Sequence, residues 1–304
     1  MAPWFSMPSL VHGRAFGLAA ATRYCLSLAQ SHYENFPIAL SLFQREEREA
    51  LASIYAFARI ADDFSDEPEF HGMRERLIDG WEVQLRRCFS GEAEHPVFIA
   101  LEPAVARHGL AMEPFLDLLD AFRQDCCKTR YETFDELLDY CRRSANPVGR
   151  LVLRVLGIHE EDFGVWSDHL CTALQLTNFW QDLSQDLARA RVYLPLEDLR
   201  RLNVRLQPLL AGEAAPSFGS LMRFEIDRTR DLFRKGKPLL AQTGYPGSLY
   251  FTAVYLGGRT VLRMVKDLKE EILFKRPVLG RRSVARILVR AGAGRVPVLS
   301  ELIS

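Results

Sequence analysis

Residues 174–195 read LQLTNFWQDLSQDLARARVYLP, and this stretch decides the interpretation of the whole chain. It has no glycine and no internal proline before Pro195 stops it, so it is predicted to form one continuous helix. Asn178, Asp182 and Asp186 are four residues apart, which places their side chains in a row on one helix face, about 6 Å apart. With no basic residue at the intervening helical positions, this row needs a cation. Its oxygen ligands suit Mg²⁺, which keeps several waters and commonly bridges to a substrate phosphate.

A second acidic stretch favours metal binding over the alternative for such rows, a solvated helix face. Residues 55–67 read YAFARIADDFSDE, with Asp62 and Asp66 again four apart and Asp63 beside them. The helix predicted over Arg45–Asp66 is mostly apolar before these residues, so its acidic end needs partners. Two such rows facing each other across a bundle would hold Mg²⁺ ions and a diphosphate. Metal-bound diphosphate is a good leaving group, and its departure leaves a carbocation.

At these residues the chain resembles the squalene/phytoene synthases, a family of isoprenoid enzymes with an all-α fold. Three motifs carry the resemblance, in the order and at the spacing of the family. The first is D-D-x-x-D preceded by Y-A-x-x-R, and the second is Q-L-x-N-x-x-x-D-x-x-x-D followed by R-x-Y-L-P. The third, R-Y-x-T-x-x-E-L-x-x-Y-C, matches Arg130–Cys141. The resemblance extends over most of the chain, from Ser31 to Phe274.

The resemblance implies a site that binds Mg²⁺ and a prenyl diphosphate. It implies catalytic residues and metal ligands at five positions of the two acidic motifs: Asp62, Asp66, Asn178, Asp182 and Asp186. It implies substrate contacts from Tyr55, Arg59, Asn35, Gln175, Arg191 and Tyr193. Arg59 and Arg191 would help to neutralise the diphosphate. Asp125 and Arg130 stand where family members contact diphosphate or metal-bound water, although each is also an ordinary charge at a helix end.

Several short segments resemble one branch of the family, the bacterial hydroxysqualene synthases of hopanoid biosynthesis. They are HYENFP from His32, HPVF from His95, SANPVG from Ser144 and NFWQD from Asn178. Phytoene and presqualene diphosphate synthases have V-A-G-x-V-G instead of SANPVG and usually carry Arg at the position of Gln181. The resemblance therefore implies that presqualene diphosphate ionises and that water captures the rearranged cation as hydroxysqualene. Two alternatives stay open: head-to-head condensation of two farnesyl diphosphates, and a non-catalytic binding or assembly protein on the same fold.

A helix predicted over residues 134–156 is interrupted by Asn146-Pro147 and Gly149. Proline removes a backbone hydrogen bond and kinks the helix. Such a kink would turn Asn146 toward the substrate pocket, where its amide could hold the capturing water. A purely steric kink is the alternative.

Composition and length fit a single all-α domain over residues 1–304, a helical bundle of the isoprenoid synthase fold around a central cavity. The chain is 48% hydrophobic, which is enough for a large core, and its 39 basic and 39 acidic residues give no overall field for nucleic acid. No nucleotide-binding fingerprint is present. The six cysteines have no metal-ligand spacing, so we expect reduced, buried thiols in a cytoplasmic protein. Further helices are predicted over Ala15–Tyr33, Met73–Phe89, Val97–His108, Glu113–Cys127, Ser217–Leu240 and Ser248–Leu262, with a short broken stretch at Leu196–Leu210.

The two ends of the chain differ in character. Residues 1–14 lack the basic start and the long apolar core of a signal peptide and are predicted to be a loose lead-in. Residues 275–304 form a basic tail, with seven Lys and Arg and no acidic residue from Lys275 to Arg295. Such a tail can lie on an anionic membrane, which would place the protein peripherally at the inner membrane surface. A tail packed on the domain or disordered is the alternative. The implied pathway partners are a presqualene diphosphate synthase and a hydroxysqualene reductase.

Overall fold

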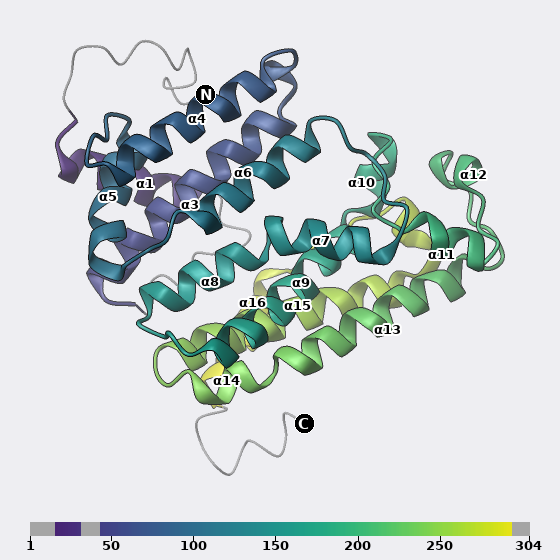
Figure 1. Cartoon of the computed structure of the whole chain (residues 1–304). Helices are drawn as coiled ribbons and strands as arrows, with labels where there is room; N and C mark the ends of the chain where they lie inside the picture. The colour runs from purple at the N-terminus through teal and green to yellow at the C-terminus, as the bar shows by residue number, and fades with distance from the viewer. Residues whose placement is uncertain (1–15, 32–42, 294–304) are drawn as a thin grey trace. The chain divides into compact units, whose positions relative to one another are not determined.

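A computed structural model describes residues 16–31 and 43–293, which form helices joined by turns and short loops (Figure 1). Over these residues there is no β-strand, and one isolated bridge pairs Arg130 with Val192. The prediction of an all-α chain is confirmed. Residues 1–14 and Asn35 lie outside the described residues.

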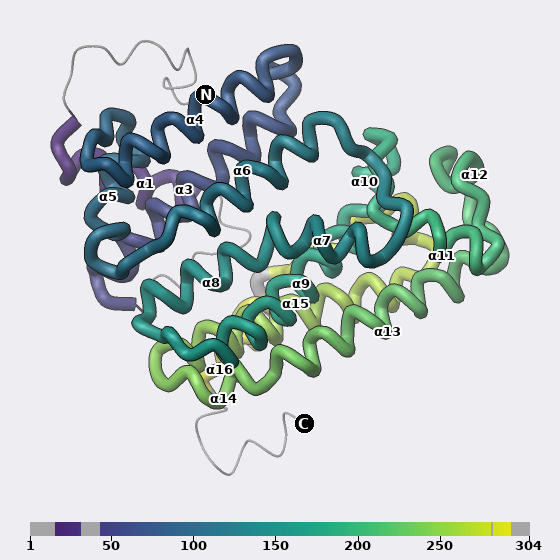
Figure 2. The backbone as a smooth tube through the Cα atoms, viewed as in Figure 1, coloured from purple at the N-terminus to yellow at the C-terminus, as the bar shows by residue number. Residues whose placement is uncertain are grey.

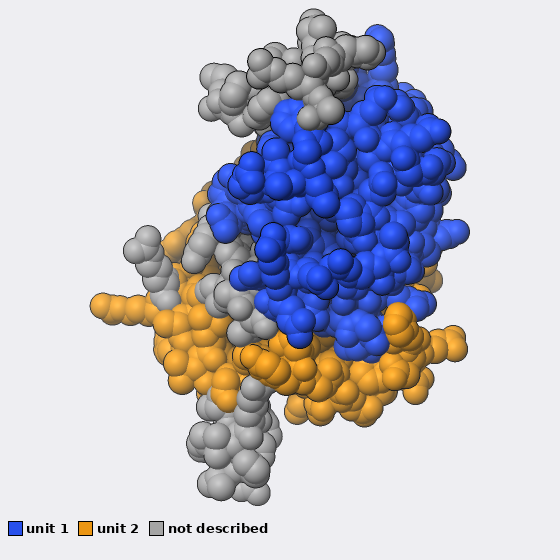
Figure 3. Space-filling view, turned by 90° about the vertical axis from the view of Figure 1, so that its left-hand side faces the viewer, with its two compact units in different colours: residues 1–128, 151–158 blue, residues 129–150, 159–304 orange. Residues whose placement is uncertain are grey.

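The chain divides into two compact units, which Figure 3 colours separately. Unit 1 consists of residues 1–128 and 151–158, and unit 2 consists of residues 129–150 and 159–304. One helix, α8 (Asn146–Val155), runs from unit 2 into unit 1. The prediction of a single domain over residues 1–304 stays a prediction.

In unit 1, the central helix is α3 (Arg45–Asp66), which carries the first acidic motif. It packs against α1 (Leu18–Ser31), α4 (Arg74–Phe89), α5 (Pro96–His108) and α6 (Glu113–Asp125). A short 3-10 turn, η1, follows it at Pro68–Phe70. The acidic motif therefore stands at the end of the helix that the other helices of the unit surround.

Aromatic packing fixes the buried face of α3. The ring of Phe57 lies 6.2 Å from that of Trp81, 5.9 Å from Phe98 and 5.1 Å from Phe115, between ring centroids. The indole Nε1 of Trp81 also donates a hydrogen bond of 3.2 Å to the backbone carbonyl of Phe57. Aromatic pairs of this kind stabilise beyond the area that they bury. Because this face is held inside, the end of the helix has a defined position in the unit.

Side-chain caps fix the starts of two helices in unit 1. The Glu47 carboxylate accepts a hydrogen bond of 2.9 Å from the backbone N–H of Gln44, at the start of α3. The imidazole Nδ1 of His95 accepts one of 3.2 Å from the N–H of Val97, at the start of α5. The HPVF segment singled out in the sequence is thus a helix start, and burial lowers the pKa of His95 to about 4, which keeps it neutral.

In unit 2, the central helix is α9 (Glu161–Gln181), which carries the beginning of the second acidic motif. It packs against α7 (Phe134–Ser144), α13 (Phe218–Gly236), α14 (Pro238–Gln242) and α15 (Gly247–Leu268), whose paths Figure 2 traces. The other elements of the unit are α10 (Leu183–Ala188), α11 (Leu196–Arg201), α12 (Leu206–Leu210), η2 (Lys269–Leu273) and α16 (Arg281–Ala293). Both acidic motifs therefore depend on a central, buried helix.

Helices α9 and α13 approach closely at one end and are joined by a hydrogen bond further along. A Cβ at Gly236 would lie 3.0 Å from backbone atoms of Trp166 and Leu170, so only glycine fits there without a shift. The indole Nε1 of Trp180 donates a hydrogen bond of 2.9 Å to the hydroxyl of Thr229. These contacts set the rotation of α9 and so the direction of its polar row.

The predicted continuous helix over residues 174–195 is wrong. Helix α9 ends at Gln181, Asp182 has φ −93° and ψ 6°, and α10 then runs only to Ala188. The second break has a tertiary reason: after Ala188, Ala190 adopts a left-handed φ of 57°, and Val192 pairs with Arg130. No glycine or proline marks either break.

The prediction of six buried cysteines is also wrong. Cys25, Cys88 and Cys141 are buried, but Cys126 and Cys171 are partly exposed and Cys127 is exposed. Cys127 lies in the turn after the end of α6, where the chain reaches the surface. All six are free thiols, as predicted.

The remaining predicted helices are confirmed with small shifts of their ends. The stretch 134–156 is interrupted as predicted, the stretch 196–210 is short and broken, and residues 217–240 form two helices because Pro238 starts a new one. The basic tail contains α16, which packs on α15.

A buried charged cluster joins α13 to α11. Glu225 is fully buried, and Arg228 donates hydrogen bonds of 2.7 Å both to it and to Asp198. The guanidinium of Arg228 also lies 3.5 Å from the centroid of the Phe134 ring. Burial raises the pKa of Glu225 to about 8, with Arg228 opposing the rise and Asp198 adding to it. The guanidinium of Arg228 thus donates hydrogen bonds to two buried carboxyl groups, those of Glu225 and Asp198.

This cluster predicts a stability that falls with rising pH. Because the folded pKa of Glu225 is about 8 and its ordinary value is 4.5, its contribution is full below pH 4.5 and is lost as the pH rises through 8. The slope reaches about 1.4 kcal/mol per pH unit at most. Glu225→Gln should flatten the dependence of the free energy of unfolding on pH between 5 and 8, measured by urea denaturation. The control is Asp227→Asn, an exposed carboxylate on the same helix. Parallel curves for wild type and Glu225→Gln would contradict the assignment.

Candidate active site

The first acidic motif occupies the last turn of α3, where helix geometry already concentrates negative charge. Asp63 is nearly buried and forms an ion pair with Arg59, one turn earlier. The Nη1 atom of Arg59 also lies 3.5 Å from a carboxylate oxygen of Asp62. Arg59, predicted to neutralise diphosphate, therefore already lies among the carboxylates of its own helix.

The carboxylate of Asp62 is held in an unfavourable electrostatic environment. Burial, Asp66 and Asp125 raise the pKa of Asp62 to about 7, while Arg59 lowers it. Because 41% of the side chain is still exposed, water screens part of this effect, and the upward direction is the result that matters. A raised carboxyl pKa marks an excess of negative charge that a bound cation would relieve.

The second acidic motif keeps its helical spacing in spite of the break at Asp182. The N–H of Asp182 donates to the carbonyl of Asn178 at 2.8 Å, and the N–H of Asp186 donates to the carbonyl of Asp182 at 2.9 Å. The three residues therefore stay one turn apart, as predicted. Asn178 is exposed, and Asp182 and Asp186 are half-buried.

The donor set of these residues fits Mg²⁺. Carboxylate and amide oxygens at one-turn spacing are hard ligands, and a bound cation would oppose the rise in the pKa of Asp62 that burial and the neighbouring carboxylates cause. Within residues 16–31 and 43–293, no three His, Cys, Asp or Glu side chains are already gathered into a metal-binding group. Mg²⁺ does not need such a cage, because it retains waters and takes further oxygens from a substrate phosphate.

The third motif joins the end of the second motif through the backbone. The N–H of Val192 donates to the carbonyl of Thr129 at 2.8 Å, and the N–H of Leu196 donates to that of Tyr131 at 2.9 Å. Two segments separated by about 60 residues in the sequence thus run alongside each other. Arg191, a predicted substrate contact, is half-buried at the start of this pairing.

An aromatic cluster lies over the same junction. The ring of Tyr193 stacks on Phe179 with 3.8 Å between centroids and 9° between planes. Tyr131 and Tyr140 of the third motif lie 5.7 Å and 6.3 Å from Tyr193. Tyr193 was predicted from the sequence as a substrate contact, whereas its neighbours were not. Tyr131 and Tyr140 belong to the third motif, which was the only sequence signal that pointed to them. Their contact with Tyr193 is visible only in the structure.

The predicted interruption near Asn146 takes the form of a helix break. Helix α7 ends at Ser144, Ala145 has φ −122°, and α8 begins at Asn146. The side-chain Oδ1 of Asn146 accepts a hydrogen bond of 2.9 Å from the hydroxyl of Thr172 on α9, and both residues are buried. Among the described residues, none accepts a hydrogen bond from Nδ2 of this amide. The hydrogen bond from Thr172 therefore fixes the orientation of the Asn146 amide at Oδ1. The N–H groups of Nδ2 are available to donate.

Gly149 holds the start of α8 against α9. A Cβ there would overlap the Oγ of Ser167 and the Sγ of Cys171, so a larger residue would push the two helices apart. Gly149 is one turn from Asn146, and Cys171 is next to Thr172. The close approach therefore sets the distance at which Asn146 and Thr172 bond.

The other predicted residues are distributed over both central helices. Tyr55 is half-buried on α3, one turn before Arg59, and Gln175 is half-buried on α9, one turn before Asn178. Tyr55 therefore lies next to the first acidic motif in unit 1, and Gln175 lies next to the second acidic motif in unit 2. Asn35 lies outside the described residues.

Two contacts of the basic tail were not predicted. Arg276 forms an ion pair with Asp182, and the amide Nε2 of Gln181 donates a hydrogen bond of 2.6 Å to the carbonyl of Pro277. The sequence offered no signal for either contact, because no periodicity connects positions 94 and 96 residues apart.

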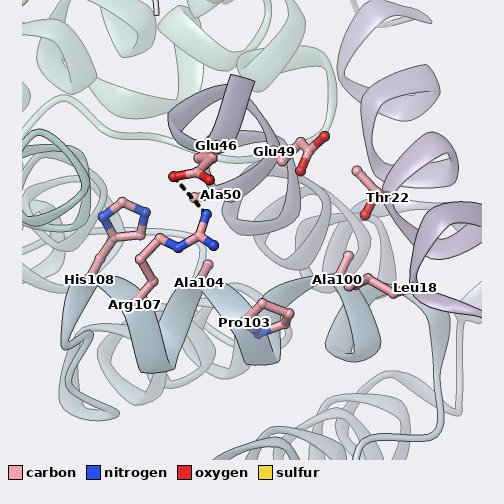
Figure 4. A pocket seen from close by; sticks show the side chains of 10 residues that line it. All are labelled: Leu18, Thr22, Glu46, Glu49, Ala50, Ala100, Pro103, Ala104, Arg107 and His108. Carbon is pink, nitrogen blue, oxygen red and sulfur yellow. Dashed lines mark ion pairs between the residues drawn. The ribbon is translucent and has the colours of Figure 1, made fainter. Parts of the chain in front are cut away.

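One small hollow of about 110 Å³ opens among α1, α3 and α5 (Figure 4). An exposed ion pair of 2.8 Å between Arg107 and Glu46 crosses it. None of the predicted site residues lines this hollow, so it is separate from the acidic motifs.

The packing at Gly149 predicts a large effect of one methyl group. Gly149→Ala should lower the free energy of unfolding by about 1–3 kcal/mol, because the new Cβ overlaps Ser167 and Cys171. The matched control is Gly80→Ala in α4, where a Cβ meets nothing within 4 Å and should stabilise by up to about 1 kcal/mol. Urea denaturation measures both. Equal shifts for the two variants would show that the approach of α8 to α9 is not constrained at Gly149.

Comparison with known proteins shows the family to which the chain is similar. The squalene/phytoene synthase family model matches residues 29–283. The hydroxysqualene synthase of Rhodopseudomonas palustris is 32% identical over 276 residues, which cover 87% of this chain and 92% of that protein. The 15-cis-phytoene synthase of Synechococcus elongatus is 29% identical over 271 residues, which cover 85% and 88%.

Solved structures show the same fold. The crystal structure of squalene synthase HpnC from Alicyclobacillus acidocaldarius matches with a TM-score of 0.79 and 38% identity, covering 83% of this chain and 95% of that one. A dehydrosqualene synthase in complex with ligand matches with a TM-score of 0.83 at 23% identity, covering 91% and 96%. The predicted isoprenoid synthase fold is confirmed, and the chain belongs to the squalene/phytoene synthase family.

Proposed function

We propose that this protein is a hydroxysqualene synthase, which converts presqualene diphosphate and water to hydroxysqualene and diphosphate. The observation that carries the proposal is the buried amide of Asn146, which Thr172 fixes at Oδ1 and which has a donor available at Nδ2. The similarity to a hydroxysqualene synthase over 87% of this chain and the 38% identity to squalene synthase HpnC support it.

The acidic motifs would bind the diphosphate through Mg²⁺. The residues that would hold the metal are Asp62, Asp66, Asn178, Asp182 and Asp186. When bound, the metal supplies positive charge that makes the diphosphate a better leaving group. Arg191 would donate charge-assisted hydrogen bonds to the same anion, and Arg59 would do so from among the carboxylates of the first motif. Tyr55 and Gln175, each one turn before its motif, would border the substrate.

The proposed reaction breaks one C–O bond and forms another. The bond to diphosphate breaks and its electron pair leaves with the diphosphate, which leaves a cyclopropylcarbinyl cation. After rearrangement, the oxygen of one water attacks the cation, and the proton that this water loses passes to the released diphosphate. Exclusion of all other water then decides the product.

Asn146 would position the capturing water. An amide N–H that donates to no protein group can be satisfied by a water oxygen or by a substrate atom. The hydroxyl of Thr172 keeps Oδ1 engaged, so Nδ2 is the atom that remains to hold a water oxygen. That water would keep its second lone pair for the cation.

Condensation of two farnesyl diphosphates is the second candidate function. Its support is that phytoene synthases are frequent among the similar curated proteins, for example that of Arthrospira platensis at 34% identity over 69% of this chain. A non-catalytic protein on this fold is the candidate of another class. The intact acidic rows argue against it, because a scaffold has no need for them.

The basic tail supports a proposal of peripheral contact with an anionic membrane. Arg282, Arg286 and Arg290 are exposed on one face of α16 with Val289, which is 71% exposed, and the opposite face packs on α15. In the part of the chain that the structure describes, no helix has the length and apolarity to cross a bilayer.

A vesicle sedimentation assay tests the proposed membrane contact. The protein should bind phosphatidylglycerol vesicles and lose that binding at high salt. Equal binding to phosphatidylcholine vesicles would contradict the proposal. A presqualene diphosphate synthase and a hydroxysqualene reductase are the proposed pathway partners.

A product assay tests the proposed reaction. The protein is given Mg²⁺ and, separately, presqualene diphosphate or farnesyl diphosphate, in ¹⁸O-labelled water without a nicotinamide cofactor. We expect a C30 alcohol that carries ¹⁸O, from presqualene diphosphate only. Consumption of farnesyl diphosphate would move the protein to the condensing branch. No turnover of either substrate by a folded sample would favour the non-catalytic alternative. Asp182→Ala should abolish turnover without unfolding the enzyme.

The role of Asn146 is tested in the same assay. Thr172→Val keeps the shape of the side chain and removes the hydrogen bond that orients the amide. We expect presqualene diphosphate to be consumed still, but with several-fold less hydroxysqualene relative to other C30 products. Ser167→Ala on the same helix face is the control and should keep the product ratio. An unchanged ratio in Asn146→Ala would exclude Asn146 as the group that holds the water.

A further inference from the structure

We infer that Cys126 and Cys127 form a redox-sensitive dithiol, in which a peroxide joins the two sulfurs as a reversible disulfide. The pair follows the last residue of α6 directly, just before the chain passes from unit 1 to unit 2 at Lys128–Thr129. It lies outside the three sequence motifs. The dithiol itself does not depend on the proposed function, whereas its expected effect on turnover rests on that function.

Exposure distinguishes Cys127 from the other thiols. All six cysteines are free, and Cys127 is the one that is exposed. Cys25 and Cys88 are buried, and mainly this burial raises the pKa of each to about 12. A thiol reacts as its thiolate, so a buried thiol with a raised pKa is inert. Cys127 is therefore the thiol that a dissolved oxidant meets first.

Cys126 is placed to resolve the first oxidation product. It is partly exposed, and its Sγ donates a hydrogen bond of 3.3 Å to the backbone carbonyl of Phe122. Burial is the largest cause that raises the pKa of the Cys126 thiol, and Arg74 opposes it. Cys126 is thus less easily oxidised than its exposed neighbour. An exposed cysteine next to a second, resolving cysteine is the arrangement common in redox-sensing proteins.

The proposed modification proceeds in two steps. The thiolate sulfur of Cys127 attacks one oxygen of hydrogen peroxide and breaks the O–O bond, which gives a sulfenic acid and, after protonation, water. The sulfur of Cys126 then attacks the sulfenic sulfur, the S–S bond forms, and the hydroxyl leaves with the Cys126 proton as a second water. The two thiols are oxidised, and the peroxide is reduced to two waters.

Disulfide formation must distort the turn that follows α6. Consecutive Cα atoms are about 3.8 Å apart, whereas disulfides usually join Cα atoms about 4.4–6.8 Å apart. In the reduced chain Cys126 is helical, with φ −67° and ψ −25°. The N–H groups of Cys127 and Lys128 both donate to the carbonyl of Gln124, at 3.1 Å and 2.8 Å. A strained, exposed disulfide of this kind is readily reduced by thiols, which makes the modification reversible.

Both ends of this turn lead to residues around the acidic motifs. On one side, Asp125 is buried and is one of the carboxylates that raise the pKa of Asp62. On the other side, the carbonyl of Thr129 accepts a hydrogen bond of 2.8 Å from the N–H of Val192, just after the second motif. A turn held at both ends passes a distortion to its neighbours. We therefore expect the oxidised protein to turn over substrate more slowly.

Mass spectrometry of the full chain tests the dithiol without an activity measurement. Trypsin cleaves after Arg123 and Lys128, so residues 124–128 form one peptide, which contains both cysteines and no other. After treatment of the folded protein with hydrogen peroxide, and digestion without reductant, this peptide should lose two hydrogen atoms. Dithiothreitol should restore them. A disulfide between two chains, or a sulfinic acid on Cys127 beside a free Cys126, would overturn the inference.

Serine variants assign the two roles. Cys126→Ser should stop at the sulfenic acid of Cys127, which dimedone labels, and Cys127→Ser should leave the Cys126 thiol unoxidised. Cys88→Ala removes a buried thiol and is the control, which should form the disulfide as the wild type does. Equal dimedone labelling of Cys126→Ser and of the wild type would contradict resolution by Cys126. The measurement on the wild type needs no variant to fold.

Turnover measures the effect on the site. Peroxide should lower turnover of presqualene diphosphate at least fivefold, dithiothreitol should restore it, and the variant with both Cys126→Ser and Cys127→Ser should keep its activity in peroxide. An equal loss of activity in that variant would show that the effect does not arise at the dithiol. If the reduced, folded protein turns over no substrate, the proposed function fails, while the mass of the 124–128 peptide still decides whether the dithiol forms.

Discussion

Repulsion between carboxylates at the ends of two buried helices is the constraint on which this structure depends. Two carboxylates about 6 Å apart repel by ~3 kcal/mol at an effective dielectric constant of about 20. The chain meets this repulsion differently in its two units. In unit 1, Arg59 lies within the acidic turn itself, and the pKa of Asp62 is still raised to about 7. In unit 2, the compensating charge comes from Arg276, far away in the sequence. Both arrangements leave carboxylates that gain from a divalent cation.

The fold supplies the rigidity that such a charge arrangement needs. In unit 1 the helix that carries the motif is the one around which the others pack. In unit 2 the central helix α9 carries the motif as far as Gln181, so packing restrains the backbone where both motifs begin. The aromatic core around Phe57 holds α3, and the contacts of Gly236 and Trp180 with neighbouring helices hold α9. Charge repulsion that the backbone cannot relieve is available to bind a cation instead. The large apolar core and the acidic motifs are therefore linked, because packing holds the carboxylates of the motifs in place.

Local sequence information predicted the parts of this arrangement that depend on local physics. Spacing of four residues gave the two acidic rows, and Pro147 gave the break before α8, because both effects act within one or two helical turns. The end of the helix at Ala188 has no such local cause, since Val192 pairs with Arg130. The stacking of Tyr193 on Phe179 and the contact of Arg276 with Asp182 likewise depend on where distant segments pack. Side-chain periodicity carries no information about pairs of residues that are far apart in the sequence. For the same reason, the sequence pointed to Asn146 but not to its hydrogen-bond partner Thr172.

The pairing of Asn146 with Thr172 would prepare this buried amide to hold one water, as the proposed reaction requires. A side-chain amide carries an acceptor oxygen and a donor nitrogen. If neither were engaged, the amide could rotate and exchange the positions of the two atoms. The Thr172 hydroxyl engages Oδ1, which removes that choice and leaves the N–H groups of Nδ2 as the donors of this amide. A donor holds a water through its oxygen and leaves that oxygen able to attack a cation, whereas an acceptor would hold the water by its hydrogen. Because Gly149 fixes the approach of α8 to α9, the position of the donor is set by backbone packing and not by side-chain flexibility. If Asn146 holds the capturing water as proposed, the same helix contact that breaks the regularity of residues 134–156 would provide the precision that capture by a single water requires.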